Sequence, residues 1–223
     1  MSSGFNVVRI VSYNSRKGLI KDYYSMAILR LNKFQVHTLN PLNIKVKNEL
    51  MCLSGASGSG KSLLLRAIAD LIEHKGETYL DEQKCSEISP VQWRKWVGFL
   101  PAESAWWLDN VGDHFSKESN SYLSQLNLPD ACLSWDVSRC STGEKQRLAI
   151  ARLLENKPKV LLLDEPTASL DPASVTAVEL LIKNYANEFR APVIWVSHDQ
   201  RQIKRLADRE FEIKNNNISE VLA

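Results

Sequence analysis

Residues 55–62, Gly-Ala-Ser-Gly-Ser-Gly-Lys-Ser, match the pattern G-x-x-x-x-G-K-[S/T] and constrain this chain more than any other feature. An apolar run typical of a buried strand precedes them at residues 50–54, and a helical pattern follows at residues 63–69. A strand, a glycine-rich loop and a helix in this order form a phosphate cradle, in which backbone N–H groups and the helix N-terminus face the anion. We expect Lys61 to reach the β- and γ-phosphates and the Ser62 hydroxyl to ligate Mg²⁺. The chain is therefore expected to bind a nucleotide.

The rest of the chain alternates between strand and helix patterns. Polar and apolar residues alternate between residues 28 and 53, which is typical of antiparallel strands with one buried face. Residues 160–163 and 193–196 are continuous apolar runs, as expected of central parallel strands, and residues 172–189 between them predict a long helix. This alternation predicts an α/β fold with a mostly parallel core sheet. The other predicted elements are a strand at 26–31, a helix from Pro90 capped by Ser89, a strand at 97–100, a mostly helical section at 104–139, helices at 141–154 and 200–207, and a terminal hairpin at 210–221.

The composition is that of an ordinary globular chain. The 223 residues fit one domain. The formal net charge of +2 implies no polyanionic partner and by itself neither supports nor excludes nucleic acid; we expect no nucleic acid partner. No apolar run approaches the roughly 18–20 residues that span a bilayer. The four cysteines lack C-x-x-C spacing, and we expect reduced thiols in a cytosolic protein. They are Cys52, Cys85, Cys132 and Cys140.

Two carboxylates end the apolar run at residues 160–163. Asp164 is placed to hold Mg²⁺, and Glu165 can polarise the water that attacks the γ-phosphate. His198 follows the next apolar run after Ser197. A lone histidine after a strand is usually structural, but this strand is expected beside the phosphate-loop strand. That position favours a contact with the γ-phosphate or with the attacking water.

Five motifs in this order resemble those of the nucleotide-binding subunit of an ATP-binding-cassette (ABC) transporter. They are residues 55–62, the signature Ser141-Thr142-Gly143-Glu144-Lys145-Gln146-Arg147, Leu163-Asp164-Glu165-Pro166-Thr167, Ser169-Leu170-Asp171, and His198. The resemblance covers about residues 26–223. It implies a P-loop NTPase of the ABC ATPase type, with an antiparallel β subdomain and a short helical subdomain at about residues 104–139. Residues 1–25 would be an N-terminal extension, and an extra edge strand at residues 6–13 is the alternative.

The same resemblance implies an ATPase that uses ATP and Mg²⁺. Glu165 would be the hydrolytic base, with Lys61 and His198 as further catalytic residues, and Ser62 and Asp164 would hold the metal. Expected nucleotide contacts within one chain are Gly55, Ala56, Ser57, Gly58, Ser59, Gly60, Lys61, Ser62 and Leu63. Phe34 is the candidate for stacking on the adenine, and His37 is the second candidate.

Subunits of this kind act as head-to-tail pairs that sandwich ATP between two copies. Ser141 and Gly143 of one copy would contact the γ-phosphate bound by the other, and Asp171 would bridge the two halves. The resemblance also implies a separately encoded transmembrane permease as partner, and a cytoplasmic location, peripheral on the inner face of the membrane. A soluble ABC ATPase of assembly or regulation stays an alternative, as does a nucleotide-gated binding module that hydrolyses slowly.

The chain departs from the family pattern at three places. Ala102 stands where a glutamine usually contacts Mg²⁺. Either water or Glu103 takes its place, or hydrolysis is slow, or Ala102 simply packs and catalysis proceeds without the glutamine. Thr142 and Glu144 replace the glycine and glutamine of L-S-G-G-Q, which predicts weaker dimer closure with binding kept. The segment between phosphate loop and signature is short, and its tryptophans predict either a groove for a partner's helix or the packing of a small subdomain. They are Trp93, Trp96, Trp106 and Trp107.

Overall fold

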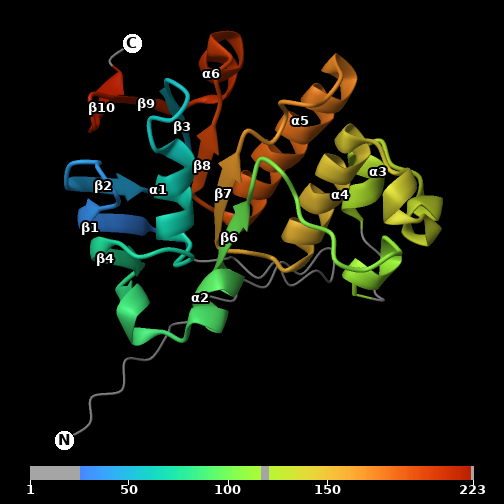
Figure 1. Ribbon diagram of the computed structural model, residues 1–223, viewed down its shortest axis with the longest axis horizontal. Helices are drawn as coiled ribbons and strands as arrows, with labels where there is room; N and C mark the ends of the chain where they lie inside the picture. The colour runs from blue at the N-terminus through green and yellow to red at the C-terminus, as the bar shows by residue number, and fades with distance from the viewer. Residues whose placement is uncertain (1–25, 117–120, 222–223) are drawn as a thin grey trace, which may run out of the picture.

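The computed structural model describes residues 26–116 and 121–221, so the predictions for residues 1–25 lie outside it. Its strands form two sheets, and the smaller one is antiparallel with the order β2-β1-β4-β5 (Figure 1). These strands are β1 (Leu29–Gln35), β2 (Leu42–Val46), β4 (Lys75–Leu80) and β5 (Gln83–Lys84). The first strand of the domain thus begins and ends later than the predicted range of residues 26–31.

The larger sheet is the core of the fold and has the order β10-β9-β3-β8-β7-β6. Its strands are β3 (Leu50–Gly55), β6 (Val97–Leu100), β7 (Val160–Asp164), β8 (Val193–Val196), β9 (Arg209–Lys214) and β10 (Asn217–Val221). Neighbours from β9 to β6 are parallel, and only β10 is antiparallel, because it returns beside β9. The turn between them has positive φ at Asn215 and Asn216, which asparagine tolerates in tight hairpins. The predicted mostly parallel core sheet and terminal hairpin are confirmed.

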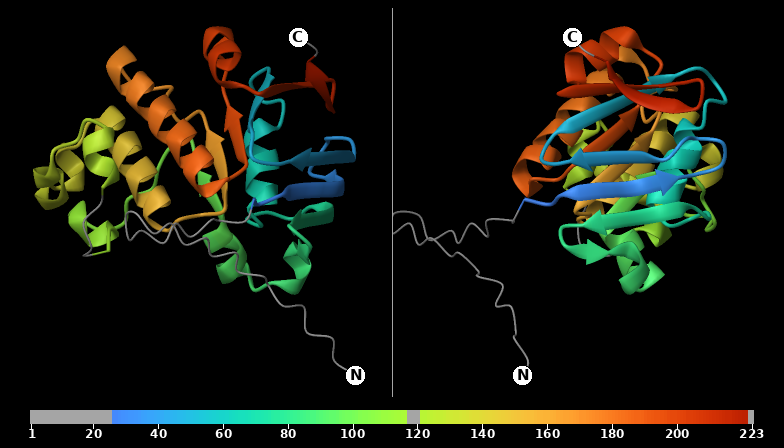
Figure 2. Two further views of the ribbon diagram at one scale, coloured as in Figure 1. Left: turned by 180° about the vertical axis from the view of Figure 1, so that it is seen from behind. Right: turned by 90° about the vertical axis from the view of Figure 1, so that its left-hand side faces the viewer.

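Six α-helices accompany the sheets among the described residues. They are α1 (Lys61–Ile68), α2 (Pro90–Trp96), α3 (Tyr122–Gln125), α4 (Thr142–Glu155), α5 (Pro172–Phe189) and α6 (Gln200–Leu206). Helix α1 lies between the two sheets, and α4 and α5 cover the other face of the core sheet (Figures 1 and 2). The predicted caps are present, since the Ser89 hydroxyl accepts a hydrogen bond at the start of α2 and Pro90 is its first residue.

The core strands are buried on both faces, which explains their continuous apolar sequences. In β7, Leu161 and Leu163 pack towards α4 and α5, whereas Val160 and Leu162 pack towards α1 and the antiparallel sheet. Successive side chains of a strand point to opposite faces, so a strand covered on both sides needs apolar residues throughout. Asp164 breaks this run at the carboxyl end of β7, where it is 4% exposed.

Residues 104–139 contain short helical turns rather than long helices. Besides α3, they form the 3₁₀ turns η2 (Gly112–His114), η3 (Asp130–Ser134) and η4 (Val137–Arg139), while a further turn, η1 (Cys85–Glu87), precedes α2. Trp93 is fully buried and donates a hydrogen bond from Nε1 to the Ile68 carbonyl at 3.0 Å, so it belongs to the core and not to a surface groove. Trp107, in contrast, is 69% exposed.

Two further expectations concern the cysteines and the membrane. All four cysteines are buried and free, as the sequence predicted for reduced thiols. None of the helices found within residues 26–116 and 121–221 combines the length and apolar character needed to cross a bilayer.

Candidate functional site

The loop between β3 and α1 has the backbone shape of a phosphate cradle. Gly55, Gly58 and Gly60 have φ values of 140°, 76° and 102°, which side chains rarely allow. A Cβ atom at Gly55 would lie 2.7 Å from the Ile213 carbonyl oxygen, so only glycine fits there. Gly60 caps α1 without a side-chain hydrogen bond, which leaves the N-terminus of this helix available to an anion.

Lys61 is folded back onto the loop. Its Nζ donates hydrogen bonds to the carbonyl oxygens of Gly55 and Ala56, both at 3.0 Å. Burial lowers the pKa of this ammonium, and the nearby charges of Glu165 and Asp164 offset the effect only in part. The lysine is thus a buried cation whose hydrogen-bond partners on the loop are neutral. A bound phosphate would supply the negative charge that these partners lack.

Ser62, in the first turn of α1, lies beside Asp164 at the carboxyl end of β7. Its hydroxyl hydrogen-bonds to the Asp164 carboxylate, although β8 separates β7 from β3, the strand that leads into α1. Burial raises the pKa of Asp164, and this hydrogen bond offsets the rise only in part. Asp164 Oδ1 is buried and has no hydrogen-bond partner within the described part of the chain. A hydroxyl beside a carboxylate with one vacant oxygen fits a hard cation such as Mg²⁺.

Glu165 and His198 form the next pair at the same end of the sheet. His198 Nε2 lies 3.0 Å from Glu165 Oε1, and the Glu165 N–H donates to the Val196 carbonyl at 3.2 Å. Glu165 has a φ of 47°, a left-handed conformation that costs about 1–2 kcal/mol for a residue with a side chain. This turn directs the residue after β7 towards the residues after β8. Behind the pair lies a buried polar network around Gln202, which the sequence analysis did not identify.

The signature residues form the N-terminus of α4. The Ser141 hydroxyl accepts the Glu144 N–H at 3.2 Å, and Glu144 Oε2 accepts both the Ser141 N–H and its hydroxyl at 2.8 Å. These bonds from the Ser141 backbone and hydroxyl lower the pKa of Glu144. Glu144 therefore completes a capping box. Thr142 is the first residue of the helix and has an ordinary helical backbone, so the glycine usual at this place is not needed for backbone freedom.

Gly143 and Asp171 lie near the start of the helices α4 and α5. A Cβ atom at Gly143 would be 3.2 Å from the Ser169 carbonyl, so the loop after β7 passes close to the signature helix. Asp171 Oδ1 accepts the N–H groups of Ala173 and Ser174 at 3.0 Å, which caps α5. The hydrogen bonds from Ser174 lower the pKa of Asp171. These residues do not join the phosphate loop of their own chain, because α4 and α1 pack on opposite faces of the core sheet.

The adenine candidate Phe34 requires a correction. Its side chain is fully buried and packs on the His74 ring with 4.6 Å between centroids, so it presents no face to a nucleotide. The second candidate, His37, is exposed. The side chain of Leu39, two residues further on, lies 3.4 Å from a Cβ atom placed at Gly60, which brings this segment beside the phosphate loop. Ala102 and Glu103 are both exposed in the loop after β6.

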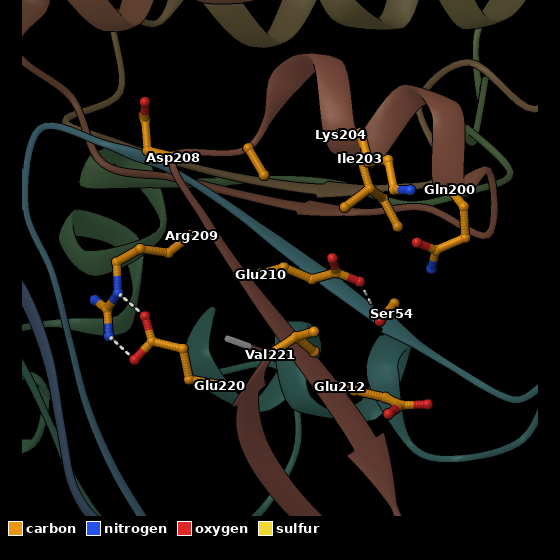
Figure 3. Close-up of a pocket in the computed structure, with 11 residues that line it drawn as sticks. Ser54, Gln200, Ile203, Lys204, Asp208, Arg209, Glu210, Glu212, Glu220 and Val221 are labelled. Atoms are coloured by element: carbon orange, nitrogen blue, oxygen red, sulfur yellow. Dashed lines mark hydrogen bonds and ion pairs between the residues drawn. The ribbon is translucent and has the colours of Figure 1, made fainter. Parts of the chain in front are cut away.

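A further hollow lies away from these residues. Its volume is about 630 Å³, and it lies between α6 and the terminal hairpin (Figure 3). Its walls carry Glu210, which accepts a hydrogen bond from Ser54 at 3.2 Å, and Glu220, which pairs with Arg209 at 2.7 Å. Glu212 adds a further carboxylate. Lys204 and Arg209 also line the hollow, but its carboxylates outnumber them, which disfavours a phosphate there.

Comparison with known proteins gives matches over most of the chain. A family model described as ABC transporter matches residues 39–168. The probable iron export ATP-binding protein FetA of Escherichia coli (strain K12) is 33% identical over 190 residues, which cover 79% of this chain and 84% of that protein. The phosphate import ATP-binding protein PstB of Aeropyrum pernix is 32% identical over 201 residues, 78% of this chain and 79% of that protein. The solved dimeric ATP-binding cassette MJ0796, bound to ADP and Pi, has the same fold, with a TM-score of 0.75 and 23% identity over 87% of this chain and 99% of that one.

Proposed function

The chain belongs to the ABC transporter family of ATP-binding subunits, and from this membership we propose how its residues divide the work of binding and hydrolysing ATP. Members of this family hydrolyse ATP to power a transporter, and this confirms the ATPase predicted from the motifs. One observation carries the residue assignment. Four residues at or after the ends of three different strands, β3, β7 and β8, gather at one end of the core sheet. They are Lys61, Asp164, Glu165 and His198. Phosphoryl transfer needs such a gathering of positioning and charge-stabilising groups.

The loop from Gly55 to Leu63 is proposed to bind the phosphates of ATP. Backbone N–H groups at the start of α1 face the anion, and Lys61 exchanges its two carbonyl partners for the β- and γ-phosphates. This exchange is supported by the burial of the ammonium, which has no anionic hydrogen-bond partner in the described residues. For the adenine, the exposed side chain of His37 is the proposed stacking partner.

Ser62 and Asp164 are proposed to hold Mg²⁺. The support is the buried Asp164 oxygen without a partner, together with the hydroxyl that already contacts the same carboxylate. The metal would neutralise charge on the β- and γ-phosphate oxygens. Ala102 offers only a methyl group, and Glu103 beside it is exposed, so neither is assigned to the metal.

Asp164→Asn tests the metal assignment through stability. The neutral amide removes a buried carboxylate that lacks full compensation, so the melting temperature without nucleotide is expected to rise by about 2–4 °C. Since the folded pKa of Asp164 is raised, the penalty in the wild type grows as the pH rises from the unfolded pKa and is complete above the folded pKa. The difference from the variant should therefore shrink as the pH falls.

The measurement is thermal unfolding between pH 5 and pH 8, with and without ATP and Mg²⁺. Mg²⁺ should add stability to the ATP-bound wild type and add much less to Asp164→Asn. Glu212→Gln, in the acidic hollow, is a control carboxylate. An equal Mg²⁺ increment in wild type and Asp164→Asn would remove Asp164 from the metal site.

For hydrolysis, Glu165 is proposed to accept a proton from the attacking water. His198 donates to the same carboxylate or to the γ-phosphate and fixes the direction of Glu165, as supported by their 3.0 Å contact. The water between them and the γ-phosphate would then be aligned for attack. This assignment needs no residue from the hollow of Figure 3.

A head-to-tail dimer is proposed to complete the site. The signature helix α4 and the phosphate-loop helix α1 cover opposite faces of the core sheet, so Ser141 and Gly143 are suited to the nucleotide of a second copy rather than their own. Asp171, beside them in the fold, would bridge the two halves. The capping box lets Ser141 keep its hydroxyl at the helix N-terminus, where an anion is favoured.

The proposed membrane partner docks on the loop after β6, which would place the subunit peripherally at the inner face of the membrane. Trp107 and Leu108 are 69% and 42% exposed, and their backbone N–H groups both donate to His114 Nε2 at 3.2 Å. The Arg152 guanidinium lies over the Trp107 ring, 4.9 Å from its centroid. A firmly held, exposed apolar pair of this kind suits a helix of a permease.

Co-purification tests the transport proposal. We expect the tagged chain, purified from its own cells in mild detergent, to bring a stoichiometric multi-span membrane protein, identified by mass spectrometry. Trp107→Ser combined with Leu108→Ser should weaken the association by about 30-fold or more and reduce the recovery accordingly, because each removes an interface anchor worth about 1 kcal/mol or more. Leu180→Ser, at an exposed leucine of α5, is the matched control. Recovery of soluble partners alone would favour an ATPase of assembly or regulation.

A further inference from the structure

We propose that Gln202 of α6 is a positioning residue that holds Glu165 and His198 in register for hydrolysis, an inference that rests on the proposed roles of this pair. Gln202 touches neither of them. It lies behind them, 4% exposed, and its side-chain amide joins the loop that carries Glu165 to the loop that carries His198. These loops follow the neighbouring strands β7 and β8.

The contact to the His198 loop runs through Ser197. The Ser197 hydroxyl donates to Gln202 Oε1 at 2.8 Å and accepts the Asp199 N–H at 3.1 Å. One oxygen atom therefore links the residues on both sides of His198. Gln202 fixes the rotamer of that serine, and the serine fixes the backbone from which the exposed imidazole projects.

The contact to the Glu165 loop runs through Thr167. Gln202 Nε2 donates to Thr167 Oγ1 at 2.9 Å, and Thr167 is itself 9% exposed. Two residues earlier, Glu165 has its left-handed backbone with a φ of 47°. A strained turn persists only where its surroundings hold it, and this hydrogen bond is one of those constraints.

Glu179 of α5 determines which way the amide points. Gln202 Nε2 also donates to Glu179 Oε1 at 2.8 Å, and Arg205 binds both oxygens of that carboxylate at 2.6 and 2.9 Å. Burial would raise the pKa of Glu179, but the hydrogen bonds from Arg205 and Gln202 outweigh it and hold the pKa below its usual value. An ionised carboxylate only accepts, so the amide nitrogen must face Glu179 and the amide oxygen is left for Ser197.

Packing alone does not hold the catalytic pair. A hollow of about 340 Å³ lies beside it, and Glu165, His198 and Gln202 all contribute to its walls. Side chains bordering such a space have few neighbours on one side, so hydrogen bonds must set their positions. Gln202 accepts a hydrogen bond from Ser197 of one loop and donates one to Thr167 of the other.

The first test is the kinetics of Gln202→Leu in the purified full-length chain. Loss of alignment should lower kcat by about 10- to 100-fold while the KM for ATP stays within about twofold, because the phosphate loop is untouched. Gln200→Leu, an exposed glutamine of the same helix, should behave as wild type. A fall in kcat that only follows the loss of folded protein, measured by circular dichroism, would make the role of Gln202 structural and overturn the proposal.

A double-mutant cycle and a charged variant make the test specific. In a His198→Ala background, Gln202→Leu should cost much less than in wild type, because its effect runs through the pair. Gln202→Glu should also lose activity, because it places a second carboxylate against Glu179 Oε1, which the amide now contacts at 2.8 Å. Full additivity of Gln202→Leu and His198→Ala, or a fully active Gln202→Glu, would contradict the proposal. If Glu165→Gln hydrolyses ATP at the wild-type rate, the proposed function of the pair fails as well. If Glu165→Gln is inactive but Gln202→Leu hydrolyses ATP at the wild-type rate, only the inference about Gln202 is refuted.

A readout without turnover is the ¹⁵N spectrum of the imidazoles, of which the chain has four. Gln202→Leu should move the His198 resonance and leave those of His37, His74 and His114 in place. An unchanged His198 resonance would show that Gln202 does not hold the pair.

Discussion

Glu165→Gln should lower the turnover number for ATP hydrolysis by about 100-fold or more while ATP still binds. The amide keeps the size of the side chain and can keep the contact to His198, now 3.0 Å from Oε1, but it cannot take a proton from water. Binding is proposed to depend on the phosphate loop, which this substitution leaves untouched. Because ATP then stays in the site, the variant should remain closed as a dimer, seen as a shift in mass by light scattering when ATP and Mg²⁺ are added.

Glu188→Gln provides the matched control, since Glu188 is an exposed carboxylate on α5. It should hydrolyse ATP at the wild-type rate and show no trapped dimer. If Glu165→Gln turned over at the wild-type rate, Glu165 would not be the base. If it lost both turnover and ATP-dependent association, the variant would have damaged binding, and the proposed division between Glu165 and the phosphate loop would be wrong.

The parts of the site that could be predicted are those in which the sequence dictates the backbone. A Cβ atom at Gly55 would clash with the Ile213 carbonyl oxygen, so glycine at this place of the motif is a requirement of the fold. The continuous apolar sequence of β7 and β8 follows from burial on both faces. Paired acids after such a strand are unusual, and Asp164 proved to be buried beside Ser62.

Phe34 lies just after an irregularity in β1 that interrupts the alternation of buried and exposed side chains. Leu29 and Leu31 face the core, and strict alternation would turn the residue at position 34 outwards, as an adenine contact needs. The pairing of β1 with β2 shifts register between Leu31 and Phe34, and Lys33 has a φ of 45°. An extra residue at a bulge reverses which face the following side chains occupy, so Phe34 enters the core.

The network around Gln202 could not be predicted because its members are far apart in the sequence. Its bonds join α6 to the loop after β7 and to α5, with separations of 35 and 23 residues. A glutamine in a short helix near Arg201 and Lys204 is ordinarily a surface residue. Only the packing of α6 against α5 and the ends of the core strands shows that this one is buried.

Lys61→Ala should weaken ATP binding by about 100-fold or more, which corresponds to about 2.7 kcal/mol. Lys61 is 5% exposed, and its Nζ donates to two carbonyl oxygens of the loop at 3.0 Å, so the ammonium already lies at the proposed phosphate cradle. The alanine removes both this contact and a buried positive charge. Burial lowers the pKa of Lys61, so the ammonium loses its proton at a lower pH than an ordinary lysine does. The ATP affinity of the wild type should therefore decline as the pH rises through this lowered pKa.

Isothermal titration calorimetry with ATP measures both effects, and circular dichroism verifies folding. The fold should survive, because Glu165 and Asp164 compensate the buried charge only in part, and α1 keeps its apolar contacts through Leu64, Leu65 and Ile68. Lys204→Ala, at an exposed lysine of α6, should bind ATP as the wild type does and keep its affinity at alkaline pH as well as the wild type. If folded Lys61→Ala retained full ATP affinity, the cradle would hold phosphate through backbone N–H groups alone. The lysine would then have to act, if at all, after binding.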